Sequence, residues 1–115
     1  MADLKKATLL ASCVGRGQKL NELVDYAQDS IVSKTLLDKP AGTITLFAFD
    51  KGQKLSEHTL PYDAVVELIE GSSRITIGGK DMHISAGEIV IMPANIPHAV
   101  TADERFKMLL IMVRQ

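Results

Sequence analysis

The sequence lacks the features that mark several large classes of protein. It has one cysteine, Cys13, and no tryptophan, so no disulfide can form within the chain. No apolar run approaches the roughly 20 residues that a membrane-spanning helix needs. Thirteen basic and fourteen acidic residues leave a net charge of −1 without charged blocks, which argues against a surface for nucleic acid or anionic lipid. We therefore expect a cytoplasmic protein with no nucleic-acid partner and no membrane partner.

Residues 1–30 show no strand-like alternation and are interpreted as an N-terminal arm. Leu20, Leu23 and Val24 have the spacing of one face of a helix. Asn21 is a residue type that can start a helix. The arm is therefore predicted to contain one short helix, peripheral to the main domain.

From Ile31 onward the chain has the texture of an antiparallel β domain. Hydrophobic residues make up 46% of the whole sequence and charged residues 23%, which is ordinary for a chain that folds around one core. Short β-branched runs are divided by turn residues, with Gly79-Lys80 as the strongest hairpin signal. We predict one β-barrel domain over residues 31–115. The predicted strands are Ile31–Leu37, Thr43–Phe49, Leu55–Leu60, Ala64–Glu70, Arg74–Gly78, Met82–Ser85, Glu88–Met92, His98–Thr101 and Phe106–Val113.

Two stretches inside this β region carry glycines and histidines at regular spacing. The first consists of Gly52, five residues, His58-Thr59-Leu60, three residues, Ala64, six residues and Gly71. The second consists of Gly87, five residues, Pro93, four residues, His98, three residues and Ala102. In this order the two stretches resemble the paired motifs of the cupin superfamily. The resemblance implies an all-β fold, the double-stranded β-helix or jelly-roll barrel, here with a short N-terminal helix.

The resemblance also implies a metal site, but two of its ligand positions are changed. Cupins hold a transition metal with three histidines and one glutamate. Here Leu60 replaces the second histidine and Ala64 replaces the glutamate, so that His58 and His98 are the remaining candidate ligands. Two imidazoles leave open whether a divalent metal such as Zn, Ni, Fe or Mn binds weakly or whether no metal binds.

Neighbouring acidic residues do not obviously restore the missing charge. Side chains alternate between the two faces of a strand, so Glu57 and Glu67 have the opposite parity to the ligand positions. Asp63 has that parity too, although a β-bulge can re-aim it. The third histidine, His83, lies between Met82 and Ile84 and is expected to face outward.

Replacement of polar ligands by Leu60 and Ala64 makes one wall of the expected pocket apolar. Phe47, Phe49 and Met92 are further candidates for its lining. The leading hypothesis is therefore a cupin that binds a small molecule in a mostly apolar pocket, oriented by His58 and His98.

Two other functions stay open on the sequence alone. One is an enzyme, either a metal-dependent isomerase or oxygenase whose ligands are completed by Asp63, water or substrate, or a metal-free catalyst with histidine as acid or base. The other is a sensing or interaction module without catalysis. No recognition helix for DNA is visible, so such a module needs a partner protein.

A homodimer is expected from the apolar strands near the ends of the domain. Residues Leu109–Val113 form a continuous apolar run, which is typical of a strand buried on both faces. Ile31–Leu37 is also apolar enough to need cover. The cupin resemblance points the same way, because small cupins usually pair.

Overall fold

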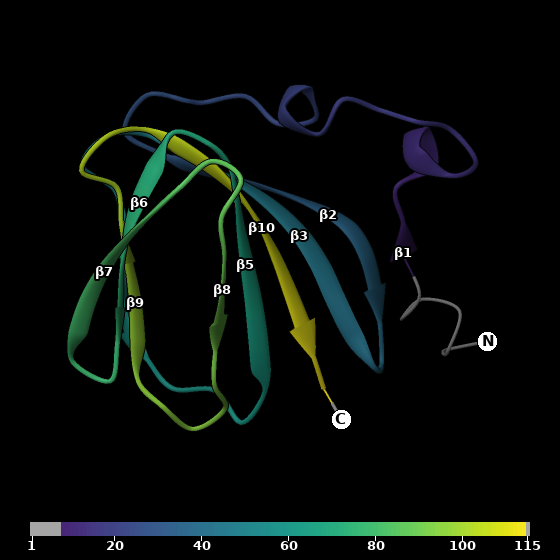
Figure 1. The fold of residues 1–115 in the computed structure, drawn as a ribbon. Coiled ribbons are helices and arrows are strands. Elements are labelled where there is room, and N and C mark those ends of the chain that lie inside the picture. Colours follow the sequence, from purple (N-terminus) through teal and green to yellow (C-terminus); the bar gives the residue numbers. More distant parts are fainter. Residues whose placement is uncertain (1–7, 115) are drawn as a thin grey trace.

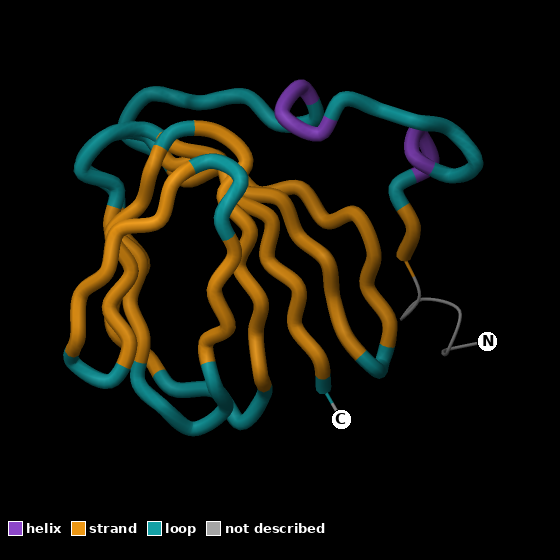
Figure 2. The backbone as a smooth tube through the Cα atoms, in the orientation of Figure 1, coloured by secondary structure: helices purple, strands orange, loops and turns teal. Residues whose placement is uncertain are grey.

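Two antiparallel sheets face each other across an apolar interior in the computed structural model, which describes residues 8–114 (Figures 1 and 2). The larger sheet has the strand order β1-β2-β3-β10-β5-β8 and the smaller sheet the order β4-β9-β6-β7. The strands are β1 (Thr8–Leu9), β2 (Ile31–Lys39), β3 (Gly42–Phe49), β4 (Lys54–His58), β5 (Asp63–Glu70), β6 (Ser72–Ile77), β7 (Lys80–Ser85), β8 (Ile89–Met92), β9 (His98–Thr101) and β10 (Phe106–Val113).

This arrangement confirms the predicted all-β jelly roll and every predicted strand, with ends shifted by two residues or fewer. Strands β4 and β8 are each one residue shorter than predicted, since β4 ends at His58 and not at Leu60 and β8 begins at Ile89 and not at Glu88. In the described part of the chain, no helix is long and apolar enough to span a membrane.

The predicted N-terminal helix is wrong. Only two short 3-10 turns form in the described part of the arm, η2 (Ala11–Cys13) and η3 (Leu20–Glu22). Asn21, which was expected to start a helix, instead donates its side-chain amide to Glu70 Oε1 at 3.4 Å. Val24 packs with Leu46 and Ala48 of β3, and Leu20 and Leu23 pack against the same cluster. The apolar residues of the arm therefore contact the sheet without forming a helix.

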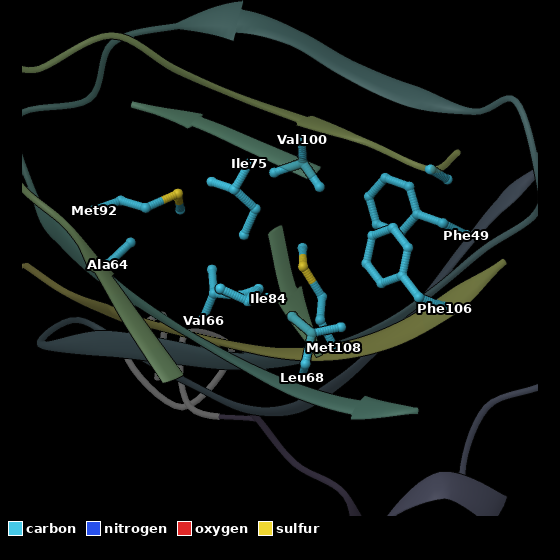
Figure 3. Packing of buried hydrophobic residues seen from close by; sticks show 11 residues of the cluster. Phe49, Ala64, Val66, Leu68, Ile75, Ile84, Met92, Val100, Phe106 and Met108 are labelled. Carbon is cyan, nitrogen blue, oxygen red and sulfur yellow. The ribbon is translucent and has the colours of Figure 1, made fainter. Parts of the chain in front are cut away.

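The core lies between the two sheets (Figure 3). Alternate residues of the central strand β10 point into it, and Phe106 and Met108 are almost fully buried. Phe106 stacks on Phe49 of β3 with a centroid distance of 4.6 Å. The buried members of this core are Phe49, Ala64, Val66, Leu68, Ile75, Ile84, Met92, Val100, Ala102, Phe106 and Met108.

The outer face of the larger sheet is covered at one end by residues 20–26, which cross it as an irregular segment (Figure 1). Lys107 of β10 lies beneath them and donates to the Asn21 backbone carbonyl at 2.6 Å. Tyr26 donates its hydroxyl to Glu70 Oε2 at 2.6 Å, and the Arg105 guanidinium lies 4.4 Å above the Tyr26 ring. These contacts fasten the arm to the ends of β5 and β10.

The pKa of the Tyr26 hydroxyl is raised above its usual range. Burial is the main cause, and the hydrogen bond to Glu70 is the second. The same bond is the main cause of a lowered pKa at Glu70. The pair is therefore a phenol donating to a carboxylate at neutral pH, which is a strong type of hydrogen bond.

Tyr26→Phe should lower the free energy of unfolding by about 1–2 kcal/mol, because it removes a hydrogen bond to a charged group. Chemical denaturation followed by circular dichroism measures this. Tyr62→Phe is the matched control, since no hydrogen bond is seen for the Tyr62 hydroxyl within residues 8–114. Equal stability of the two variants would show that the Tyr26–Glu70 bond does not hold the arm.

Candidate functional site

Two histidines meet where β4 and β9 pair. His58 and His98 stand opposite each other in the antiparallel ladder, and their Nε2 atoms are 3.1 Å apart. The ring centroids are separated by 4.3 Å, with an interplanar angle of 69°. The fold thus brings together the two histidines that the motifs single out.

The loop before His98 is held in place by the backbone. Asn95, in the left-handed region with φ of 65°, donates its N–H to the Leu60 carbonyl at 2.7 Å. The Pro97 carbonyl accepts from the Gly78 N–H at 2.8 Å. Pro97 has no N–H of its own, so it fits a loop position that needs only an acceptor.

The Nδ1 atoms of both rings face backbone carbonyls, which can only accept hydrogen bonds. His58 Nδ1 lies 2.8 Å from the Ser56 oxygen, and His98 Nδ1 lies 3.3 Å from the Ile96 oxygen. The shorter contact assigns the proton of His58 to Nδ1. Its Nε2 therefore carries a lone pair, to which His98 Nε2–H donates across 3.1 Å. Both rings are neutral in this assignment.

Burial distinguishes the two histidines. His98 is 3% exposed, whereas His58 is exposed at the rim. Burial, followed by the proximity of His58, lowers the pKa of His98 below its ordinary value. At neutral pH the inner imidazole is therefore uncharged, in agreement with the hydrogen-bond assignment.

A cavity of about 60 Å³ opens beside the histidine pair. Five of the predicted site residues line it: His58, His98, Leu60, Ala64 and Met92. Five further residues complete its wall, and all of them are apolar: Leu55, Val100, Met108, Leu110 and Met112.

Two predicted lining residues lie elsewhere. Phe47 and Phe49 are not part of this cavity wall. Phe49 is fully buried in the stack with Phe106, and Phe47 tilts against Phe49 with centroids 6.1 Å apart. Both belong to the packed core.

Some of the wall residues that the sequence analysis missed could have been found from the alternation of side chains along a strand. Met108, Leu110 and Met112 share one parity along β10, and Val100 is two residues after His98. Val100 follows from the motif position of His98, and the three β10 residues share one face because side chains alternate along a strand. The same signal says nothing about which strand stands next to which.

The remaining acid and histidine candidates do not join the site. Asp63 is exposed and accepts from the Ala94 backbone N–H at 2.8 Å, so it holds the loop after β8. The side chain of His83 is 67% exposed and its Nε2 lies 3.9 Å from Asp103 Oδ2. Among the described residues, no group of three His, Cys, Asp or Glu side chains is placed to hold a metal.

A family model described as "Cupin domain" matches residues 45–113, more than half of the chain. The chain therefore belongs to the cupin family, whose barrels bind small molecules or metals.

Several solved structures are similar to this chain over most of its length. A conserved protein of unknown function from Streptococcus pyogenes is 38% identical, with a TM-score of 0.83 over 87% of this chain and 88% of that one. A cupin 2 conserved barrel domain protein from Leptotrichia buccalis is 44% identical, with a TM-score of 0.80 over 83% of this chain. This chain spans only 46% of that protein.

More distant structures show the shared fold. A cupin superfamily protein from Desulfitobacterium hafniense is 26% identical, with a TM-score of 0.83 over 87% of this chain and 92% of that chain. No curated protein matches the sequence.

The donor set does not fit the divalent metal centre that the family implies. Catalytic zinc sites use three protein ligands, and open iron sites use two histidines and a carboxylate. Here Leu60 and Ala64 add no donor atom to the two imidazoles. The site as built is a neutral imidazole pair in an apolar wall.

The free energy of unfolding should fall as the pH is lowered from 7.5 to 5.5. It should fall less in the His98→Leu variant. The unfolded chain takes up a proton near its ordinary pKa of 6.5, whereas folded His98 resists protonation until lower pH. Unfolding by urea at a series of pH values measures the slope, with exposed His83→Asn as the control. The assignment is contradicted if His98→Leu keeps the full wild-type slope.

Proposed function

We propose that this cupin binds a small molecule through a polar group placed between His58 and His98. The observation that carries the proposal is the Nε2–Nε2 separation of 3.1 Å at the wall of a cavity that is otherwise apolar. Two imidazole nitrogens are the only polar side-chain groups in the described wall, so they set the orientation of any ligand.

The size of the cavity limits the ligand. A volume of about 60 Å³ is far below the roughly 300–1,000 Å³ of a pocket that encloses a drug-sized molecule. Only a head group of a few atoms enters. The remainder of a larger ligand has to stay at the rim, where His58 is exposed.

The hydrogen-bond pattern favours a hydroxyl as this head group. A ligand that separates the two rings has to satisfy an acceptor, His58 Nε2, and a donor, His98 Nε2–H. A hydroxyl both donates and accepts, so it can replace the imidazole–imidazole bond without leaving an unpaired polar atom. A carboxylate only accepts, and it would leave the His58 lone pair unsatisfied.

A second candidate is an enzyme in which the histidine pair acts as a general base through the His58 Nε2 lone pair. The lowered pKa of His98 keeps that ring uncharged at neutral pH, so that its Nε2–H can hold His58 in the tautomer that exposes this lone pair. The variant of this hypothesis in which Asp63 completes a metal site is less favoured, because Asp63 bonds to Ala94 outside the cavity wall.

His58→Leu and His98→Leu should each weaken binding of small hydroxylated compounds by about tenfold or more, since each removes a hydrogen bond in an apolar site. Titrations with small alcohols and hydroxy acids, followed through the imidazole NMR signals, measure affinity. His83→Leu is the control and should bind as the wild type does. Unchanged affinity in both pocket variants would exclude the proposed site.

The expected homodimer is proposed on the outer face of the larger sheet. One row of apolar side chains crosses all six strands in register, and its outer members Leu9 and Ile91 are 50% and 62% exposed. The row consists of Leu9, Leu37, Ile44, Ile111, Val65 and Ile91.

A second copy fits this face because the face has both a projection and a hollow. Ile89 and Ile91 project from the edge strand β8. At the opposite side of the sheet a groove of about 240 Å³ is lined by Leu37, Ile44 and Ile111, among others. In a two-fold symmetric dimer, Ile89 and Ile91 of each copy pack into the groove of the other copy.

Light scattering at micromolar concentration should give the mass of two chains for the wild type and of one chain for Ile91→Glu. The introduced carboxylate would be buried without a partner in the interface, which is costly. Ile96→Glu, in the loop before β9, should stay dimeric. A wild-type mass of one chain would refute the dimer.

A further inference from the structure

Sulfur is concentrated around the histidine pair. Three of the five methionines of the chain line the same cavity as His58 and His98, namely Met92, Met108 and Met112. Methionine is a flexible, polarizable residue that often fills gaps in a core. The cavity lining contains no aspartate or glutamate, so thioethers and imidazoles are its only side-chain donors.

Two of these methionines flank the position that the cupin motif assigns to glutamate. In the ladder of the larger sheet, Ala64 of β5 pairs with Met92 of β8 on one side and with Met112 of β10 on the other. Figure 3 shows Ala64 and Met92 side by side, with both side chains pointing into the barrel. Directly opposed residues have Cβ atoms about 4.5–5.5 Å apart, so both thioethers reach the space beside the Ala64 methyl.

This donor set differs from the family's set in charge and in softness. Imidazole and thioether are both neutral, so they cannot offset the charge of a divalent ion in an apolar wall, where an uncompensated charge is costly. Thioether ligands favour soft ions such as Cu(I), which carries a single charge.

We propose that His58, His98, Met92 and Met112 form a binding site for Cu(I). The inference rests on the pocket of the proposed function and names the ion that this pocket would take. Met108 lines the same cavity but pairs with Leu68 and Phe47 further along β10, so it is not included.

The spacing of the two imidazoles suits a shared ion. Nitrogen ligands at about 2.0–2.1 Å from one metal ion, at an angle near 100°, have nitrogens about 3.1–3.2 Å apart. The observed Nε2–Nε2 distance is 3.1 Å. The ion takes the place of the hydrogen between the rings, and His98 then carries its proton on Nδ1, where the Ile96 carbonyl lies 3.3 Å away as an acceptor. No proton is released in this exchange.

An ion can enter from the rim. His58 is exposed, and Met112 is partly exposed near the end of β10. Inner residues Met92 and His98 are 3% exposed each. The site therefore has one ligand pair at its mouth and one at its base.

The test is a titration of the full chain, free of affinity tags, with Cu(I) kept reduced by ascorbate under nitrogen. Competition with a chromogenic Cu(I) chelator gives stoichiometry and affinity. We expect one Cu(I) per chain and an X-ray absorption spectrum with both nitrogen and sulfur neighbours. Met92→Leu/Met112→Leu should bind Cu(I) about tenfold or more weakly and lose the sulfur signal. Leucine conserves the volume, so folding is expected to persist.

Met82→Leu is the matched control, because Met82 packs against the core but lies outside the cavity wall. It should bind Cu(I) as the wild type does. A wild type that binds Cu(I) with no sulfur neighbour, or a double variant with unchanged Cu(I) affinity, overturns the thioether site.

His58→Leu separates this inference from the proposed function. If it abolishes the binding of hydroxylated compounds while Cu(I) binding is absent in the wild type, the Cu(I) site fails and the small-molecule pocket stands. If His58→Leu changes neither kind of binding, both proposals fail.

Discussion

Strand β10 has to be buried on both faces, and the arrangement of the other elements follows from that requirement. Met108 points into the barrel while Leu109 points to the outer face of the same sheet. A strand that is apolar on both faces cannot leave one of them in water without exposing a large apolar surface. The smaller sheet covers one face, and residues 20–26 cover part of the other (Figure 1).

One charged residue on this strand explains how the covering segment is attached. Lys107 is 7% exposed, and a buried ammonium needs hydrogen-bond or charge partners. The Asn21 carbonyl at 2.6 Å and the Glu70 carboxylate at 3.9 Å provide them. The arm is thus fixed by polar contacts at the edge of an apolar patch.

Strand positions were predictable because they depend on local chemistry. Turn glycines such as Gly71 adopt a positive φ of 74°, and a Cβ at Gly71 would lie 2.6 Å from the Arg105 carbonyl oxygen. The motif glycine is therefore explained by sterics. The irregular course of residues 20–26 was not predictable in the same way, because tertiary contacts to Glu70 and β3 outweigh the weak helical preference of a few residues.

The pocket was predicted only in part, because alternation reveals the face of a residue and not its depth along the barrel. Phe47 and Phe49 do point inward, as expected, but they pair with Met108 and Phe106. Ala64 pairs with Met112. From Phe106 to Met112 a strand rises about 20 Å, so the stack of Phe49 on Phe106 lies further along the same interior than the pairing of Ala64 with Met112.

The loss of the family's glutamate and second histidine changes what the barrel can stabilise. A centre with a carboxylate offsets the charge of a divalent ion, whereas the wall around His58 and His98 has no side chain that carries a negative charge at neutral pH. A neutral hydroxyl is compatible with such a wall because it exchanges one hydrogen bond for two. A soft monovalent ion is compatible because Met92 and Met112 offer polarizable sulfur beside Ala64. For both proposed ligands, the feature of the wall that matters is therefore the absence of a charged side chain.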